Sequence, residues 1–139
     1  MLHLGNADPG RFCWVDLAAS DADAAKTFYG QMFGWTSSEQ AADGGSFTRL
    51  RRSGQDVGSV YQLSARHREN GVPSHWTPYV RVDDIDAVVQ RAVALGGEVI
   101  VRPFAVAGTA RIALILDCVG AQVGLWEPIG LSKGETIHA

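Results

Sequence analysis

The sequence predicts an α+β fold built from two tandem βαβββ modules. The first observation is a repeat, because "SDADAA" at residues 20–25 recurs as "DDIDAV" at residues 83–88, an offset of 63 residues. The second is that this offset also relates the glycine that closes each segment, Gly34 and Gly97. The third is that β-rich runs flank both segments. A fixed period of this kind indicates a duplicated supersecondary unit.

Each repeated segment is predicted to be an amphipathic helix, with apolar residues at helical spacing. The starts carry capping-box spacings, and glycines at the ends provide left-handed stops. The apolar positions are Ala25, Phe28, Tyr29, Met32 and Phe33 in the first segment, and Ile85, Val88, Val89, Ala92 and Val93 in the second. The capping boxes are Ser20 with Asp23 and Asp83 with Asp86, and the stops are Gly34 and the Gly96, Gly97 pair.

One β-rich run precedes each helix and three follow it. The runs before the helices are "RFCWVDLA" and "WTPYVRV". Those after them are "TSSEQ", "SFTRLR" and "DVGSVYQL" in the first half, and "EVIVRP", "RIALIL" and "AQVGLWE" in the second. We therefore expect a single domain over residues 1–139, with modules at about 10–63 and 76–128, a polar linker at 64–75 and a loosely held tail at 129–139.

Composition narrows the functional classes. The chain of 139 residues is long enough to bury a core without disulfides or metals. Its two cysteines, Cys13 and Cys118, sit in apolar contexts without metal-ligand spacing, so we expect buried thiols and a cytoplasmic location. No secretory leader or membrane-spanning run is expected. The formal net charge of −3, with no basic stripe, argues against a nucleic-acid partner.

Three segments in this order carry a resemblance to a known family: "WVDLAASDADAAKTFYGQMFGW", "HWTPYVRVDDIDAVVQRAVALGGEV" and "DCVGAQVGLWEP". The chain resembles the vicinal oxygen chelate superfamily of glyoxalase I, bleomycin-resistance proteins and extradiol dioxygenases over about residues 10–128. The motifs resemble those of an uncharacterised bacterial branch of this superfamily that is often labelled "glyoxalase-like". The resemblance implies a curled cup of eight strands with helices outside. It also implies that enzymes of this type hold a divalent metal with four side chains, from the first and last strand of each module.

Carried over residue by residue, the family's four ligand positions lack suitable donors. A histidine seven residues before the aspartate of each helix start falls on Trp14 and Thr77. The glutamate of the last strand falls on Gly124, and its counterpart in the first module is Gly58 or Tyr61, depending on the alignment. A divalent ion needs several oxygen or imidazole donors, so we expect no metal and no other cofactor.

Neighbouring residues are weak substitutes as ligands. His75 shares the strand face of Thr77 but lies beyond the centre of the implied cup, and it is interpreted as a solvated or capping residue. Glu127 should face the opposite way from Gly124. The histidines at positions 3, 67 and 138 lie in terminal or linker segments.

Strand alternation predicts what the cup contains instead. The expected ligand-binding residues alternate with core positions such as Cys13, Val15, Val80 and Val82. They combine aromatic surface with a few polar groups, and Gly124 is expected to leave room where the glutamate would stand. The residues are Trp14, Asp16, Thr77, Tyr79, Arg81, Gly124 and Trp126.

Asp16 is the candidate catalytic residue. Walled by Trp14 and Trp126, its carboxylate would have a raised pKa and could act as a general base or as a ligand-orienting acceptor. The structural alternative is an ion pair with Arg81, Arg49 or Arg111. No nucleophile elbow or phosphate-cradling loop is found in the sequence.

The sequence leaves two main functions open, and a third class, a pure interaction module, is also considered. The favoured one is metal-independent binding of a small, partly aromatic organic molecule, by a sequestering protein or a cofactorless enzyme. The alternative is a divalent-metal-dependent lyase or dioxygenase that uses non-standard ligands such as His75, Asp16 and Glu127. A pure interaction module would instead fill the cup with its own side chains. The curled open sheet that the resemblance implies leaves edge strands that need covering, and proteins of this family often cover them by pairing chains, so we expect a homodimer.

Overall fold

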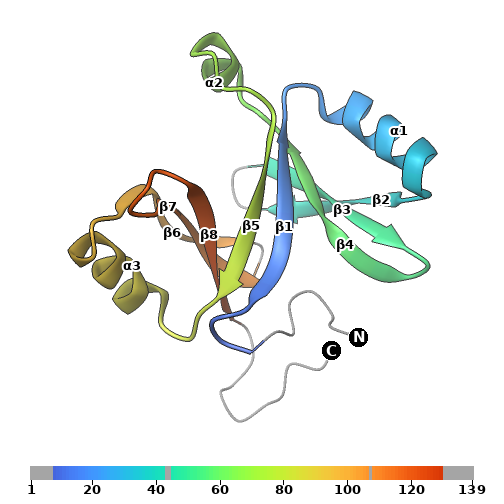
Figure 1. The fold of residues 1–139 in the computed structure, drawn as a ribbon. Coiled ribbons are helices and arrows are strands. Elements are labelled where there is room, and N and C mark those ends of the chain that lie inside the picture. The colour runs from blue at the N-terminus through green and yellow to red at the C-terminus, as the bar shows by residue number, and fades with distance from the viewer. Residues whose placement is uncertain (1–7, 43–44, 107, 130–139) are drawn as a thin grey trace. The chain divides into compact units, whose positions relative to one another are not determined.

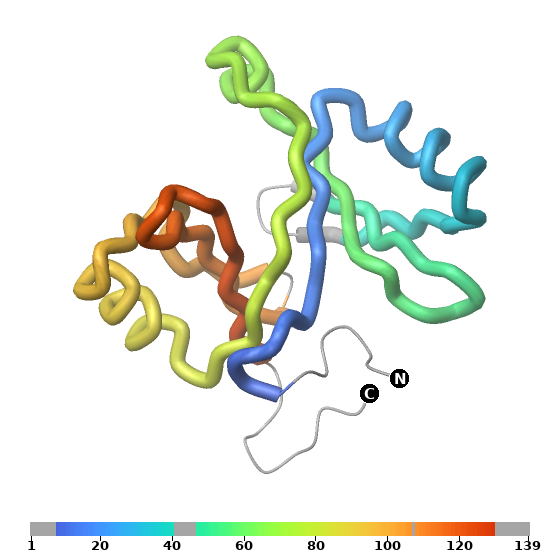
Figure 2. The backbone as a smooth tube through the Cα atoms, viewed as in Figure 1, coloured from blue at the N-terminus to red at the C-terminus, as the bar shows by residue number. Residues whose placement is uncertain are grey.

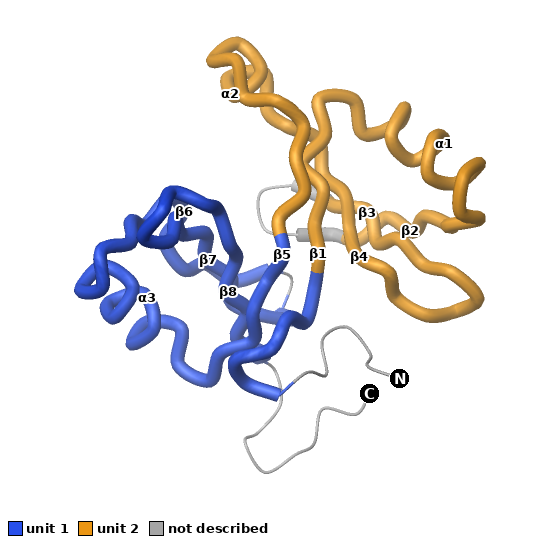
Figure 3. The backbone as a smooth tube through the Cα atoms, in the orientation of Figure 1, with its two compact units in different colours: residues 1–14, 78–139 blue, residues 15–77 orange. Residues whose placement is uncertain are grey.

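The computed structural model describes residues 8–42, 45–106 and 108–129. The described residues lie in two compact units, unit 1 (residues 1–14 and 78–139) and unit 2 (residues 15–77), shown in Figure 3. The boundary does not follow the predicted modules, since the start of β1 belongs to unit 1 and the start of β5 belongs to unit 2. The tail was expected at residues 129–139, and residues 130–139 of it lie outside the described residues.

The α+β class and the tandem βαβββ order are confirmed (Figure 1). The first module comprises β1 (Phe12–Ala19), α1 (Ala22–Phe33), β2 (Thr36–Ala42), β3 (Gly45–Arg52) and β4 (Gln55–Gln62). A short helix, α2 (Ala65–Glu69), lies within the predicted linker. The second module comprises β5 (His75–Arg81), α3 (Ile85–Ala94), β6 (Glu98–Val106), β7 (Ala110–Leu116) and β8 (Gln122–Pro128).

The strands form one eight-stranded sheet with the order β2-β3-β4-β1-β5-β8-β7-β6. The two halves of this order are equivalent, since β1 pairs with β4 in parallel as β5 pairs with β8. The remaining pairs, β2 with β3, β3 with β4, β6 with β7 and β7 with β8, are antiparallel hairpins. Figure 2 follows the chain through each set of strands.

The helix starts are equivalent but lie one residue later than predicted. Asp21 and Asp84 are the N-caps, each with an extended backbone, and their carboxylates accept hydrogen bonds from the amides of Ala24 at 3.0 Å and Ala87 at 3.2 Å. The predicted capping boxes from Ser20 and Asp83 are therefore wrong in register. The predicted stop at Gly34 is confirmed, because its φ is 74° and its amide bonds to the Gly30 carbonyl.

Each unit has a core of its own. In unit 2, α1 packs on one face of the strands over Leu17, Ala19, Leu50 and Val60. In unit 1, α3 packs over a cluster in which Ile85 is fully buried. The remaining buried members of that cluster are Val82, Ala113, Ile115 and Leu125.

The apolar stripe of α1 is only partly buried. Ala25 and Tyr29 pack on the unit 2 core as expected. Phe28, Met32 and Phe33, predicted from the same stripe, instead have exposed fractions of 54%, 56% and 45%. The sequence pattern thus describes a wider apolar surface than the strands of unit 2 cover.

Candidate functional site

Three aromatic rings meet on one face of unit 1. Trp14 comes from β1, Tyr79 from β5 and Trp126 from β8, and their rings form a cluster that also holds Cys13 and contacts Ile112 and Leu114. The ring centroids of Trp14 and Trp126 are 5.4 Å apart, and those of Tyr79 and Trp126 are 6.1 Å apart and nearly perpendicular. We call Trp14, Tyr79 and Trp126 the unit 1 aromatic cluster.

The strand register explains why the cluster forms. Tyr79 lies beside Gly124, and Arg81 lies beside Trp126, in the parallel pair of β5 with β8. Paired residues project their side chains to the same face of a sheet, so Tyr79, Arg81, Gly124 and Trp126 share one face. Sequence alternation correctly predicted this shared face.

The Tyr79 ring fills the space beside Gly124. A Cβ built on Gly124 would lie 2.2 Å from Cδ2 and 2.4 Å from Cε2 of Tyr79, far inside van der Waals contact. The expectation that Gly124 leaves room for a ligand is therefore wrong, because the phenol ring lies directly against its backbone. Tyr79 is only 3% exposed, so the ring is part of the packed interior.

Arg81 and Cys13 lie beside this cluster. The Arg81 side chain is about one fifth exposed, and its guanidinium lies 3.9 Å from the Asp83 carboxylate. Burial raises the pKa of the Cys13 thiol to about 12, although the positive charge of Arg81 acts in the opposite direction. Cys13 is fully buried as predicted, whereas Cys118 is exposed, which corrects the expectation of two buried thiols.

Only one of the two thiols should therefore react in the native protein. At pH 8 a thiol reagent such as Ellman's reagent is expected to titrate about one thiol per chain, at Cys118, because thiolate and access are both required. Cys13 stays protonated up to a pH near 12. Denaturant should release the second equivalent. Two fast equivalents in wild type without denaturant, with one fast equivalent remaining in Cys118→Ser, would contradict the burial of Cys13.

In unit 2, polar side chains lie on neighbouring strands β1, β4 and β3. Asp16 on β1 lies beside Ser59 on β4, and the Ser59 hydroxyl donates a 2.8 Å hydrogen bond to Asp16 Oδ1. Arg49 on β3 lies beside Ser59 in turn, so the three side chains share a face. Tyr61 follows on that face of β4, and burial together with the charge of Asp16 raises its pKa to about 12. Its phenol is therefore a neutral donor at physiological pH.

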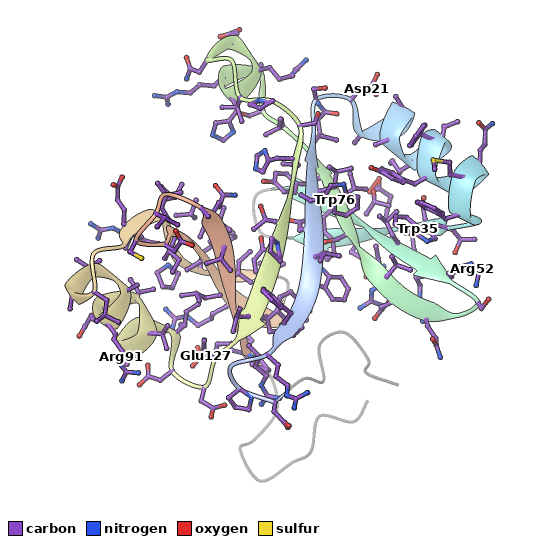
Figure 4. The ribbon with its side chains drawn as sticks, viewed as in Figure 1. Asp21, Trp35, Arg52, Trp76, Arg91 and Glu127 are labelled. Carbon is purple, nitrogen blue, oxygen red and sulfur yellow. The ribbon has the colours of Figure 1, made fainter. Side chains whose placement is uncertain are left out.

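Two of the arginines considered as partners of Asp16 take part in ion pairs with other carboxylates. Arg49 Nε lies 3.3 Å from Asp56. Arg111 donates to Asp86 at 2.8 Å and 3.2 Å, and these bonds hold the Asp86 pKa below its usual value. Arg111 also lies 3.5 Å from Glu127, which Figure 4 labels on β8.

The remaining sequence candidates lie in unit 2. Thr77 is 5% exposed on β5. His75 is the first residue of that strand, and its Nδ1 lies 2.9 Å from the Pro73 carbonyl oxygen, a contact with the preceding loop. The structure thus brings together Trp14, Tyr79, Arg81, Gly124 and Trp126 in unit 1, and places Asp16 and Thr77 in unit 2.

The strand register resolves the uncertain fourth ligand position. Asp16 and Tyr79 are related by the 63-residue offset, and they lie beside Ser59 and Gly124 respectively. Ser59 is therefore the counterpart of Gly124, and neither Gly58 nor Tyr61 is. Sequence reasoning missed Ser59, because it counted residues across turns of unequal length.

These four positions do not fit a divalent metal. They hold an indole at Trp14, hydroxyls at Thr77 and Ser59, and at Gly124 a backbone against which the Tyr79 ring is packed. Within residues 8–42, 45–106 and 108–129, no three His, Cys, Asp or Glu side chains gather as a metal site would require.

The fold agrees with comparisons to known proteins. A sequence model of the Glyoxalase/Bleomycin resistance protein/Dioxygenase superfamily matches residues 11–124. The chain belongs to this superfamily. None of the described helices has the length and apolar character needed to cross a membrane.

Named relatives are longer than this chain. It is 37% identical over 116 residues to "Putative glyoxylase CFP32" of Mycobacterium tuberculosis, covering 82% of this chain and 44% of the relative. It is 34% identical over 140 residues to "Anthracycline biosynthesis protein DnrV" of Streptomyces peucetius, covering 93% of this chain and 50% of the relative. The chain thus spans about half the length of the curated relatives it matches.

Solved structures share the fold at lower identity. Methylmalonyl-CoA epimerase from Mycobacterium tuberculosis superimposes with a TM-score of 0.61 and 22% identity, over 92% of this chain and 93% of that one. The hypothetical protein BH1468 from Bacillus halodurans gives a TM-score of 0.63 with 15% identity, over 86% and 95%. At such identities the likeness shows the fold alone.

Proposed function

We propose that this chain is a metal-independent member of its superfamily that binds a small, partly aromatic organic molecule. The observation that carries the proposal is the unit 1 aromatic cluster, in which Trp14 occupies one of the four ligand positions of the family and the Tyr79 ring packs against another, Gly124. The partly exposed indole of Trp126, which packs on the buried rings of Trp14 and Tyr79, would offer a rigid surface for an aromatic ligand, and an aromatic pair contributes about 0.5–1.5 kcal/mol beyond area burial. Trp126 is the least buried of the three rings and is the proposed contact.

Polar groups near this cluster would orient the ligand. Arg81 shares the face of Tyr79, Gly124 and Trp126, and we propose that its guanidinium donates hydrogen bonds to a carbonyl or hydroxyl oxygen of the ligand. In unit 2, Asp16 and Thr77 are proposed as further ligand contacts. Asp16, held by Ser59, is the proposed general base or orienting acceptor if the protein is an enzyme.

The proposal is tested by calorimetric titration with a panel of planar aromatic compounds. An anthracycline is the first probe, since two relatives are named for anthracycline biosynthesis. Trp126→Ala is expected to weaken binding by about 30-fold, the effect of losing a 2 kcal/mol hot spot. Trp76→Phe, which alters a partly exposed tryptophan of unit 2, is the matched control and should leave affinity unchanged. Equal affinity in Trp126→Ala and wild type would refute the assigned surface.

Asp16→Asn separates a functional carboxylate from a structural one. The amide keeps the shape and can still accept from Ser59, but it cannot act as a base. A variant that keeps ligand affinity and loses turnover would support catalysis. A variant with unchanged binding and a lower melting temperature would assign Asp16 a structural role.

Metal content tests the competing function, a metal-dependent lyase or dioxygenase. The purified protein would be incubated with Zn, Ni, Mn and Fe(II) salts, desalted and analysed for bound metal. We expect far less than one metal per chain, because the family's four positions lack donors. Near-stoichiometric metal that disappears in His75→Ala would overturn metal independence. The proposal also includes a cytoplasmic location and a homodimer.

A further inference from the structure

One face of unit 1 carries a row of side chains that crosses four strands. In the strand register, Trp126 on β8 lies between Arg81 on β5 and Ile112 on β7. Phe104 follows Ile112, because β6 is the next strand after β7 in the sheet (Figure 1). Residues that pair in this way project their side chains to the same face. We call Arg81, Trp126, Ile112 and Phe104 the unit 1 row.

A β-bulge places Phe104 on this face. Val101 on β6 pairs with Leu114 on β7. The next pair is Phe104 with Ile112, so β6 advances by three residues while β7 advances by two. Without the extra residue, Val101 and Phe104 would face opposite sides of the sheet, since side chains alternate along a strand. Bulges often re-aim a side chain in this way beside a functional site. The Phe104 ring stays 44% exposed at the end of the row.

The internal repeat shows that the fold does not require an apolar surface on this face. The strand pairing of the two modules is equivalent, but the side chains beside the unit 1 row differ in kind from their counterparts. In unit 1 these neighbours are Tyr79, Gly124, Leu114 and Val101. In unit 2 the equivalent paired residues are Asp16, Ser59, Arg49 and Ser38. The apolar character of unit 1 therefore needs an explanation other than the formation of the sheet.

The charged residues that adjoin the row on β7 and β8 lie on the opposite face. Arg111 precedes Ile112 and Glu127 follows Trp126, so alternation directs both away from the row. Arg111 donates a 2.8 Å hydrogen bond to Asp86 at the start of α3 and lies 3.5 Å from Glu127. The part of β7 and β8 that carries the row is therefore uncharged.

Arg81 makes one end of the row positive. Its guanidinium lies 3.9 Å from the Asp83 carboxylate, which is beyond hydrogen-bond distance. The Asp83 side chain is 71% exposed, so solvent screens its charge. Although burial dominates the pKa of the Cys13 thiol, the charge of Arg81 also acts on it, which places the guanidinium near the aromatic cluster. A negatively charged oxygen of a ligand would be stabilised at this end of the row.

The spacing of the strands sets the length of a ligand that contacts the whole row. Neighbouring strands lie about 4.8 Å apart, so Trp126 and Phe104, on β8 and β6, are separated by about 10 Å along the sheet. Arg81 lies one strand further away, which gives about 14 Å along the sheet from Arg81 to Phe104. A tricyclic fused aromatic system with an acidic group at one end has about this length, and a bicyclic one is shorter.

We propose that the unit 1 row binds a flat, fused-ring aromatic acid, with its carboxylate at Arg81 and its far ring on Phe104. The inference rests on the proposed function and deepens it, since it names the class of ligand and adds Phe104 as the residue that selects for length. Trp126 and Ile112 form the surface between the two ends. The carboxylate accepts hydrogen bonds from the guanidinium, and the rings lie over apolar side chains.

Calorimetric titration with three probes tests the acidic end: a bicyclic naphthalenecarboxylate, a tricyclic anthracenecarboxylate and the matching anthracenecarboxamide. Wild type is expected to bind the tricyclic acid about tenfold more tightly than its amide, because only the acid forms a charge-assisted hydrogen bond with Arg81. Arg81→Gln should remove this difference. Equal affinity of wild type for the acid and the amide would overturn the assignment of the acidic end, without any variant.

Phe104→Ala tests the far end of the row. The tricyclic acid should bind this variant about tenfold more weakly than wild type, whereas the bicyclic acid, which ends before Phe104, should bind both equally. The fold should tolerate the change, because the ring is 44% exposed on the last strand of the sheet. The matched control is Ile100→Ala. Ile100 has the same exposed fraction on the same strand, but it lies in the other bulge, between Val99 and Val101, and all affinities should be unchanged.

The outcomes separate this inference from the proposed function. Binding of an anthracycline but of neither acid would keep the proposed function and overturn this inference. Binding that depends on Trp126 but is unaffected by Phe104→Ala, or is weakened equally for both acids, would keep the aromatic surface and remove Phe104 from it. If none of these compounds binds to wild type, both proposals are wrong.

Discussion

Replacing Gly124 by alanine is expected to destabilise the protein by about 1–3 kcal/mol, the range of overpacking in a dense interior. The added methyl group would overlap the Tyr79 ring, since its position lies 2.2 Å from Cδ2. Tyr79 is almost fully buried between strands and cannot turn away without disturbing Trp126. Urea denaturation followed by circular dichroism would measure the loss in the free energy of unfolding.

A double-mutant cycle with Tyr79→Ala identifies the cause. Removal of the ring eliminates the overlap, so Gly124→Ala should cost at least about 1 kcal/mol less in the Tyr79→Ala background than in wild type. An equal cost in both backgrounds would show that the penalty arises elsewhere, for example in the β8 backbone. Ala113→Gly, which removes a buried methyl group without creating overlap, provides a reference for changes in the same unit.

Truncation of Leu50 to alanine is expected to cost about 2–5 kcal/mol, as for other fully buried leucines. Leu50 is 2% exposed in the unit 2 core, and Ile85, fully buried in the unit 1 core, should show a similar loss as Ile85→Ala. Val119→Ala is the matched control, because Val119 is 83% exposed and its truncation should change stability by less than about 0.5 kcal/mol.

The same two variants test the expectation of a single domain. If the two units unfold together, Leu50→Ala and Ile85→Ala will each shift one common urea transition, seen identically by fluorescence and circular dichroism. Two transitions, with Leu50→Ala moving one and Ile85→Ala the other, would show that the cores unfold independently and would contradict the single domain.

The repeat allowed most of the fold to be predicted, since each element type in one module has a partner in the other. The pattern of apolar residues was less informative about burial. It marks Phe28 and Met32 as apolar, but it contains nothing about how wide a surface the strands offer to α1, and only the structure shows both residues exposed. The helix α2 was missed because five residues are too few for a helical period, although its N-cap, Ser64, is visible in the sequence.

The candidate site was predicted in part, for a related reason. Alternation along β5 correctly assigned Tyr79 and Arg81 to one face, because that relation is local. The counterpart of Gly124 depends on pairing between strands distant in sequence. A register shift between Leu50 and Arg51 in the hairpin of β3 with β4 changes that count, so Ser59 could not be found by counting from a turn glycine. The contact of Tyr79 with Gly124 likewise involves residues 45 positions apart.

That contact makes the change at the ligand position hard to reverse. A glutamate introduced at Gly124 alone would meet the phenol ring, and removal of the ring alone would leave a hole among Trp14, Trp126 and Leu114. Either substitution alone lowers the stability of the protein, and only the second one restores it. A protein with Gly124 and Tyr79 therefore cannot regain a glutamate at this position through one substitution without losing stability. A lineage with this pair of residues would therefore explore new ligands around the tyrosine more readily than it would regain the carboxylate.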